Sequence, residues 1–227
     1  YWLMDKKKGS TLVFNRVNIQ TDIEHKRDSI DVKDIIKTNT ETFHLNPVRI
    51  LSGEMSKNKK EFFKPVKNKI HSGLDTFAST GIPLLSAIID GHFKIPVYTF
   101  MPLIDPIHGI KFLSQSLTKK LSIRGIPKLK ISTNSFGRKF QMITYLYDVN
   151  KYGAAKLITH GAFSGDKAEG VIDMEIVATA YDIPIGNKLA LVIDTKDLLY
   201  APNSLKPFKL EFEFGNNKDN QLRIPVN

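Results

Sequence analysis

Apolar and polar residues alternate along much of the second half of the chain, and an alternation of period two is typical of a β-strand. Phe208–Phe214 alternates without a break, which predicts four apolar side chains on one sheet face and the charged ones on the other. Within Asn187–Asp194 the odd-numbered and the even-numbered positions both carry apolar residues. We therefore expect a strand that is buried on both faces. Aromatic and β-branched residues predict further strands at Leu129–Thr133, Phe140–Val149 and Val171–Thr179.

Turn residues separate these strands at regular intervals. Glycine, proline and asparagine punctuate the chain where each strand is expected to end. The breaks are Asn150–Gly153, Gly165–Asp166, Gly170, Pro184–Gly186, Gly215–Asn217 and Pro225. Short strands with frequent turns favour an all-β fold, a jelly-roll β-sandwich, over units in which helices connect parallel strands.

The first half of the chain is less regular. We expect strands at Thr11–Ile19 and Phe43–Leu51, a charged loop at Asp22–Asp28, and an exposed Lys-rich stretch at Lys57–Ser72. Thr80–Asp90 is compatible with a pair of strands or a short helix. Nothing in the composition marks a linker, so residues 10–227 are predicted to form a single domain.

Composition excludes several classes of site. The absence of cysteine rules out disulfides, thiolate metal sites and a cysteine nucleophile, and it leaves the compartment open. No apolar run reaches 18 residues, so we predict no membrane-spanning segment. The chain begins at Tyr1 without a recognisable signal peptide. We therefore expect it to be part of a longer protein.

The net charge is +10, which permits an anionic partner without requiring one. The densest basic stretch, Lys57–Lys69, holds six lysines and one glutamate. It is interpreted as a solvated loop in preference to an anion-binding patch. Basic residues are not interleaved with stacking aromatic residues, and no nucleic-acid-binding signature occurs, so nucleic acid is not expected as a partner.

The chain lacks recognisable catalytic motifs. Hydrolases of the α/β type place their serine in a Gly-x-Ser-x-Gly turn, and this pentapeptide is absent. The most similar segment, Asn134–Gly137, lacks the first glycine and is interpreted as a hairpin loop. No two histidines have the spacing of a helical metal pair. The histidines are His25, His44, His71, His92, His108 and His160, and His44 and His160 fall on expected strands.

Acidic residues offer only weak candidates. Asp194 and Asp197 flank the end of a strand; they could form an acid–base pair, but a solvated turn is the favoured interpretation. Asp148 is expected to cap the turn that follows it. Asn216–Asn220 is polar enough for calcium but contains Lys218 and no periodic ligand pattern. We therefore assign no catalytic, cofactor-binding or metal residue, and expect no cofactor.

Tyrosine is the main source of rings for a stacking platform, because Trp2 is the single tryptophan. Most of the tyrosines are expected to be half-buried strand residues. They include Tyr98, Tyr145, Tyr147, Tyr152, Tyr181 and Tyr200.

Four segments of the second half carry a resemblance to a known family. They are Leu121–Pro127, Thr144–Val149, Lys156–Gly161 and Ala180–Leu191. In this order they resemble the C-terminal domain of X-Pro dipeptidyl-peptidases and of the related cocaine-esterase-like acyl hydrolases. The resemblance runs from Phe112 to Ile224, whereas Lys57–Ile110 matches no family pattern.

The resemblance implies a galactose-binding-like jelly roll without catalytic residues of its own. In this family a serine, a histidine and an aspartate of an upstream α/β-hydrolase domain carry out the chemistry. Residues 1–9 would then be the remnant of that domain, and no triad residue carries over to this chain. The sandwich would pack on the hydrolase domain, wall the substrate pocket and contribute to homo-oligomer contacts.

Two other functions remain open, since a fold does not fix a function. A stand-alone carbohydrate-binding module predicts a concave face with exposed aromatic rings. A nucleic-acid-binding protein predicts lysines and arginines gathered on one face. The hydrolase-domain hypothesis predicts a flat, exposed apolar patch.

Overall fold

The fold is seen in a computed structural model that describes residues 16–20, 27–31, 39–73, 76, 78, 98–202, 206–215 and 217–227. The expectations for residues 1–9 and 80–90 lie outside these residues, as do most of the loop predicted at 22–28 and the first part of the strand predicted at 11–19.

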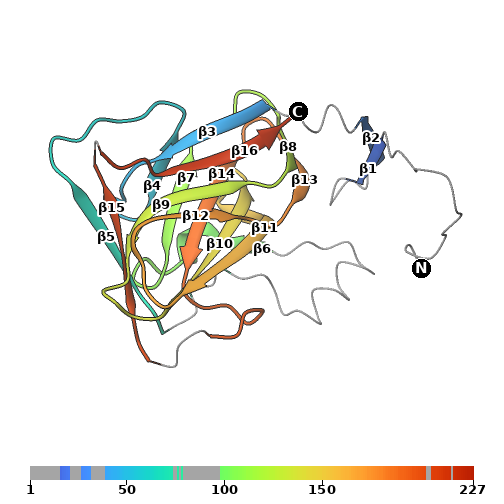
Figure 1. The fold of residues 1–227 in the computed structure, drawn as a ribbon. Coiled ribbons are helices and arrows are strands. Elements are labelled where there is room, and N and C mark those ends of the chain that lie inside the picture. The colour runs from blue at the N-terminus through green and yellow to red at the C-terminus, as the bar shows by residue number, and fades with distance from the viewer. Residues whose placement is uncertain are drawn as a thin grey trace, which may run out of the picture.

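Strands dominate the described residues, as predicted (Figure 1). The one helical element in the described part of the chain is a single 3-10 turn, η1 (Met101–Leu103). The strands are β1 (Arg16–Gln20), β2 (Arg27–Asp31), β3 (Asn39–Leu45), β4 (Gly53–Ser56), β5 (Val66–His71), β6 (Tyr98–Phe100), β7 (Ile110–Ser114), β8 (Leu121–Gly125), β9 (Lys128–Asn134), β10 (Phe140–Val149), β11 (Ala154–Gly165), β12 (Glu169–Glu175), β13 (Thr179–Ile183), β14 (Lys188–Asp194), β15 (Lys209–Phe214) and β16 (Gln221–Val226).

Fourteen of these strands form one hydrogen-bonded sheet that folds over on itself, while β1 and β2 pair with each other. We call β5, β15, β9, β12, β16, β3, β8 and β13 layer A, and β7, β14, β10, β11 and β6 layer B. β4 joins the layers, pairing antiparallel with β3 and parallel with β7. The arrangement is the β-sandwich that the strand pattern predicted.

The main core lies between the two layers. Layer A contributes Leu129 of β9 and Leu222 of β16, and layer B contributes Leu191 of β14 and Leu146 of β10, all of them fully buried. β10 and β14 are buried on both faces, because their alternate residues enter a second apolar cluster on the far side of layer B. The expectation for Asn187–Asp194 is therefore confirmed.

Three boundaries differ from the prediction. The strand expected at Phe43–Leu51 ends at Leu45, where Asn46 and Pro47 leave the sheet. Lys57–Ser72 contains a strand, β5. Its Ile70 enters the core, while Lys67, Lys69 and His71 point outward. Val171–Thr179 is divided between β12 and β13.

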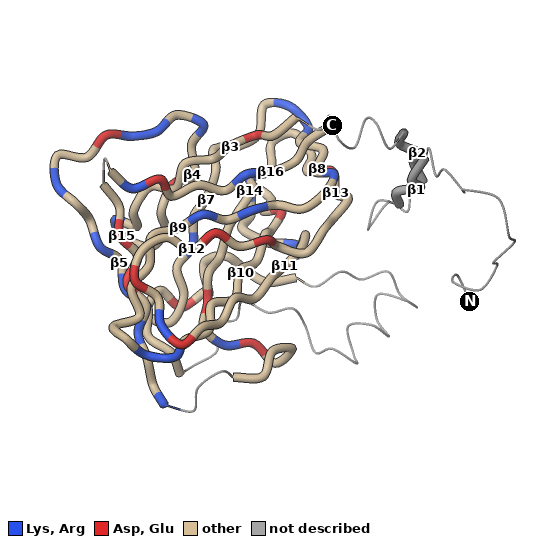
Figure 2. Tube along the Cα trace, viewed as in Figure 1, with Lys and Arg blue, Asp and Glu red and all other residues tan. Residues whose placement is uncertain are grey.

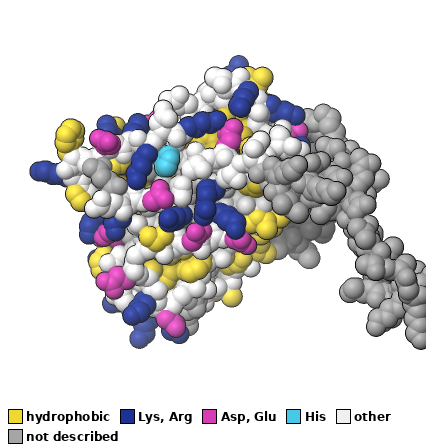
Figure 3. Space-filling model, turned by 45° about the horizontal axis from the view of Figure 1, so that its top comes forward, with side chains coloured by type: hydrophobic (Ala, Val, Ile, Leu, Met, Phe, Trp, Pro, Cys, Tyr) yellow, Lys and Arg dark blue, Asp and Glu magenta, His cyan; other side chains and the backbone are white. Residues whose placement is uncertain are grey.

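The outer face of layer A is charged. Figure 2 shows basic residues on β9 and β16 beside acidic residues on β12. Lys128 pairs with Glu175 at 2.7 Å, and Arg223 pairs with Asp173 at 3.1 Å. In Figure 3 the two signs of charge are mixed across the visible face. Cross-strand pairs of opposite sign suit a face that meets water.

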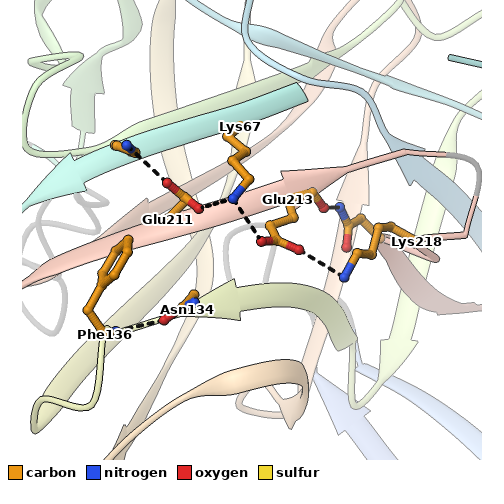
Figure 4. Close-up of polar contacts among 8 residues, drawn as sticks. Lys67, Asn134, Phe136, Glu211, Glu213 and Lys218 are labelled. Atoms are coloured by element: carbon orange, nitrogen blue, oxygen red, sulfur yellow. Dashed lines mark hydrogen bonds and ion pairs between the residues drawn. The ribbon is translucent and has the colours of Figure 1, made fainter. Parts of the chain in front are cut away.

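Glu211 departs from the alternation that placed it among exposed charges. The apolar residues of β15 enter the core as predicted, but Glu211 is only 3% exposed. Lys67 and Lys69, from the paired strand β5, lie 2.7 and 3.1 Å from its two carboxylate oxygens and cover it. Figure 4 shows Lys67 shared between Glu211 and Glu213, with Lys218 on the far side of Glu213.

Candidate interdomain surface

The outer face of layer B is apolar and covered. Outward side chains of β10, β14 and β11 are buried there beneath Ala78 and the η1 turn. They are Ile143, Tyr145, Tyr147, Val149, Ala155, Ala190 and Val192. This cover explains why β10 shows no exposed side chain.

Lys111 holds the covering segment in place. It lies on β7, is 6% exposed, and points its ammonium group at the backbone carbonyl of Met101, 2.7 Å away. The carbonyl of Ile104 lies 3.5 Å from the same nitrogen. Burial lowers the pKa of Lys111 below its ordinary value. The contact joins the η1 turn to the sheet through a charge-assisted hydrogen bond.

Asp194 and Asp197 do not form the solvated turn that we expected. Their exposed fractions are 0% and 4%. Asp194 accepts hydrogen bonds from the hydroxyl of Thr76 and from the backbone of Thr195. Asp197 accepts one from the hydroxyl of Tyr145 at 2.8 Å and one from the backbone of Leu199 at 2.7 Å. The two carboxylates are buried because hydroxyl groups of residues far away in the sequence donate hydrogen bonds to them.

His160 extends this buried polar group on β11. Its Nδ1 lies 2.6 Å from the hydroxyl of Tyr200, and the two share a hydrogen bond. Burial lowers the pKa of His160, while Asp197 opposes that change. Burial, with Asp197 and Asp194 nearby, raises the pKa of Tyr145. At neutral pH the histidine is neutral and the tyrosine protonated, so the group fixes the turn after β14.

Two of the described histidines have hydrogen-bond partners other than serine. His160 bonds Tyr200, and His108 bonds Asp105. The hairpin expected at Asn134–Gly137 is not formed, because this loop joins β9 of layer A to β10 of layer B and the two strands pair with other strands. Its Ser135 is buried and holds the loop through the backbone of Ala168 and Arg138. That serine is not presented to a substrate.

The described residues also hold no group of three or more acidic or histidine side chains that could bind a metal ion. In the segment considered for calcium, Asn220 is buried and joins strands. Its amide bonds the carbonyl of Glu213 and the backbone of Ser132. Its amide group therefore already has structural partners.

Asp148 does not cap the turn after β10. Its carboxylate is buried and accepts hydrogen bonds from Tyr181, at 2.9 Å, and Asn187, at 2.7 Å. Burial raises its pKa, and these two bonds act in the opposite direction. The side chain of Asn150 caps the turn instead, accepting from the backbone of Tyr152 and Ala154.

An exposed apolar patch borders the covered face. β6 is the terminal strand of layer B, and Phe100 lies opposite Ala154 of β11. We define the β6 patch as Tyr98, Phe100, Leu103 and Tyr152, which are 57, 42, 62 and 73% exposed. Tyr152 joins the patch because the carbonyl of the adjacent Gly153 accepts a hydrogen bond from the backbone of Met101, the η1 residue directly after β6. Exposed apolar groups gathered in this way mark a surface for a partner.

The tyrosines divide between the interior and this patch. Tyr145, Tyr147 and Tyr181 are almost fully buried, while Tyr98 and Tyr152 are more than half exposed. The sequence indicated half-buried strand residues for most of them. It gave no sign of which rings would reach the surface, because exposure here depends on the pairing of β6 with β11.

Solved structures share this fold. An aminopeptidase from the marine sediment archaeon Thaumarchaeota archaeon matches with a TM-score of 0.71 and 10% identity over 97% of this chain and 42% of its own. An α-amino acid ester hydrolase matches with a TM-score of 0.67 and 12% identity, over 93% of this chain and 41% of its own. A CocE/NonD family hydrolase from Staphylococcus aureus matches with a TM-score of 0.59 and 8% identity, over 93% of this chain and 41% of its own.

These likenesses concern the fold, and the chain spans about two-fifths of the length of those structures. No curated protein matches the chain. Among the described elements there is no helix with the length and apolar character needed to cross a bilayer.

A family model gives the identity of the domain. The model describes the X-Pro dipeptidyl-peptidase C-terminal non-catalytic domain and matches residues 37–166. The match includes 57–110, where no family pattern was recognised in the sequence, and it covers more than half of the 227 residues. The chain belongs to the X-Pro dipeptidyl-peptidase C-terminal non-catalytic domain family.

Proposed function

We propose that this domain packs on an α/β-hydrolase domain of the same parent protein and shapes access to its active site. The serine, histidine and aspartate that cleave an amide or ester would lie in that domain. Support comes from the family match and from the hydrolases and aminopeptidase that share the fold over two-fifths of their length.

The difference between the two outer faces carries the proposal. The outer face of layer A bears cross-strand ion pairs and suits solvent. The outer face of layer B is apolar, is covered by Ala78 and the η1 turn, and ends in the β6 patch. The core of a protein interface is poor in charged residues and rich in aromatic ones. The β6 patch therefore fits contact with another domain better than the charged face does.

Two alternatives fit less well. A sugar platform needs open ring faces, but the ammonium group of Lys151 lies 4.9 Å from the centre of the Tyr152 ring. Binding of nucleic acid needs basic residues gathered apart from acidic ones. On layer A, Lys128 and Arg223 are instead paired with carboxylates.

A matched pair of variants in the full-length parent enzyme tests the proposal. Phe100→Asp places a charge in the β6 patch, and Val171→Asp places one on layer A at a side chain that is 56% exposed. We expect Phe100→Asp to lower kcat/KM about tenfold or more, because a charge forced into an interface loosens it. Val171→Asp should leave kcat/KM within about twofold.

Hydrogen exchange of the same parent supplies the structural readout. Backbone amides of β6 should exchange faster in the Phe100→Asp variant and at the wild-type rate in the Val171→Asp variant. Equal kcat/KM and equal exchange in the two variants would reject the β6 patch as the interdomain contact.

A further inference from the structure

A cavity of about 310 Å³ opens where the parallel strands β4 and β7 end side by side. Met55 and Ser114 form the last pair of this ladder. The loop that follows β4, with Lys57, and the loop that follows β7, with Lys119, both line the cavity and form its walls. The volume is at the lower end of the range for small-molecule pockets.

The floor of the cavity is apolar. Phe43, Met55 and Leu121 line it and are also members of the main core, with exposed fractions of 3, 1 and 4%. Leu117 is partly buried and packs against the same core. A hydrocarbon chain that entered the cavity would meet these side chains without displacing a hydrogen bond from them.

The rim is charged, with a surplus of positive charge. Lys57, from one wall, lies 3.0 Å from the carboxylate of Glu41. Lys119, from the other wall, lies 3.8 Å from the second oxygen of the same carboxylate. At that distance Lys119 forms no hydrogen bond with Glu41. A second carboxylate would complete the set of acceptors for the two ammonium groups.

We propose that this cavity binds a small amphiphilic carboxylate, with its hydrocarbon chain on the apolar floor and its head group between Lys57 and Lys119. Charge complementarity selects this ligand class over a neutral or cationic amphiphile. Among the described residues that line the cavity, the buried Phe43 is the only aromatic one, so they offer no open ring for a stacked sugar or base. The site is independent of any catalytic activity of the parent.

Titration of the chain with sodium octanoate tests the site, with isothermal calorimetry and NMR chemical shifts as readouts. We expect saturable binding with a dissociation constant of about 1 mM or tighter, with shifts at Met55 and Leu117. Acetate lacks the hydrocarbon chain and 1-octanol lacks the charge, so both should bind at least about tenfold more weakly.

Substitution of the two lysines at the rim of the cavity provides matched variants. The double variant Lys57→Gln/Lys119→Gln should weaken octanoate at least about tenfold, whereas Lys64→Gln, outside the cavity, should bind as the wild type does. Both rim lysines are more than half exposed, so the double variant should fold, and its circular dichroism checks this.

Three results would overturn the proposal. One is the absence of saturable octanoate binding. Another is equal binding of octanoate and octanol, which would indicate apolar adsorption alone. The third is unchanged binding in a folded Lys57→Gln/Lys119→Gln variant, which would place the ligand elsewhere.

Discussion

The hydroxyl of Tyr145 donates a hydrogen bond to the carboxylate of Asp197, 2.8 Å away, on the covered face of layer B. The two residues lie 52 positions apart in the sequence, and the bond ties the middle of β10 to the turn that follows β14. Because both residues are buried, neither has ready access to water as a substitute. The contact therefore stabilises the face of layer B that Ala78 and the η1 turn cover.

Removing the hydroxyl should weaken the fold. Tyr145→Phe keeps the ring but takes one donor from a buried carboxylate, and we expect a loss of about 1–3 kcal/mol in the free energy of unfolding. Tyr152→Phe, at a ring that is 73% exposed, should change it by less than about 0.5 kcal/mol. Urea denaturation at pH 7 measures both variants. Equal losses of unfolding free energy in the two variants would show that the buried Tyr145–Asp197 hydrogen bond stabilises the fold no more than an exposed hydroxyl does.

Glu211 should make stability depend on pH. Burial alone would raise its pKa, but the hydrogen bonds from Lys67 and Lys69 outweigh burial and hold the pKa below the ordinary value of 4.5. A carboxylate with a lowered pKa in the native state contributes stability that is complete above the pKa of the unfolded chain. That contribution is lost as the pH falls through the lower native pKa.

The difference in unfolding free energy between wild type and Glu211→Gln should therefore be constant above about pH 5 and shrink toward about pH 3. Urea denaturation at a series of pH values measures it. Lys67 and Lys69 are about half exposed, so 0.5 M salt should reduce the difference as well. A difference that keeps its size down to pH 3 would contradict the assigned pKa.

Gly53 should tolerate no side chain. A β-carbon at this position would lie 2.4 Å from the ring of Phe112 and 2.4 Å from the carbonyl of Asn46. Gly53→Ala should cost about 1–3 kcal/mol or more, because a packed ring and a backbone group would have to move. Gly215→Ala offers the control, since its β-carbon would have no neighbour closer than 3.7 Å. Thermal unfolding of the two variants should separate them by several degrees, and similar midpoints would mean that Phe112 yields easily.

Much of the fold follows from local pattern. We predict β15 from the alternation of apolar and charged residues, and β14 from a continuous apolar run that suits a strand buried on both faces. The turn at Asn150–Gly153 was predicted from residue type, and Gly153 adopts a positive φ of 89° that favours glycine. β5 was missed because its one core residue, Ile70, stands among lysines and gives too weak a signal.

The buried charges could not be predicted in this way. Asp197 and Glu211 are buried because donors arrive from Tyr145 and Lys67, which lie far away in the sequence. Because these partners lie far away in the sequence, local pattern does not indicate them, and both carboxylates were expected to be solvated. The β6 patch escaped prediction for the same reason, since its exposure depends on the pairing of β6 with β11.

If this domain is non-catalytic, the reactive serine of the parent enzyme lies in another domain, and active-site labelling can locate it. The full-length parent would be labelled with a fluorophosphonate probe, digested and mapped by mass spectrometry to find the modified serine. We expect a single labelled serine outside the 227 residues of this chain. A label on any serine within these residues would show that the domain is itself catalytic.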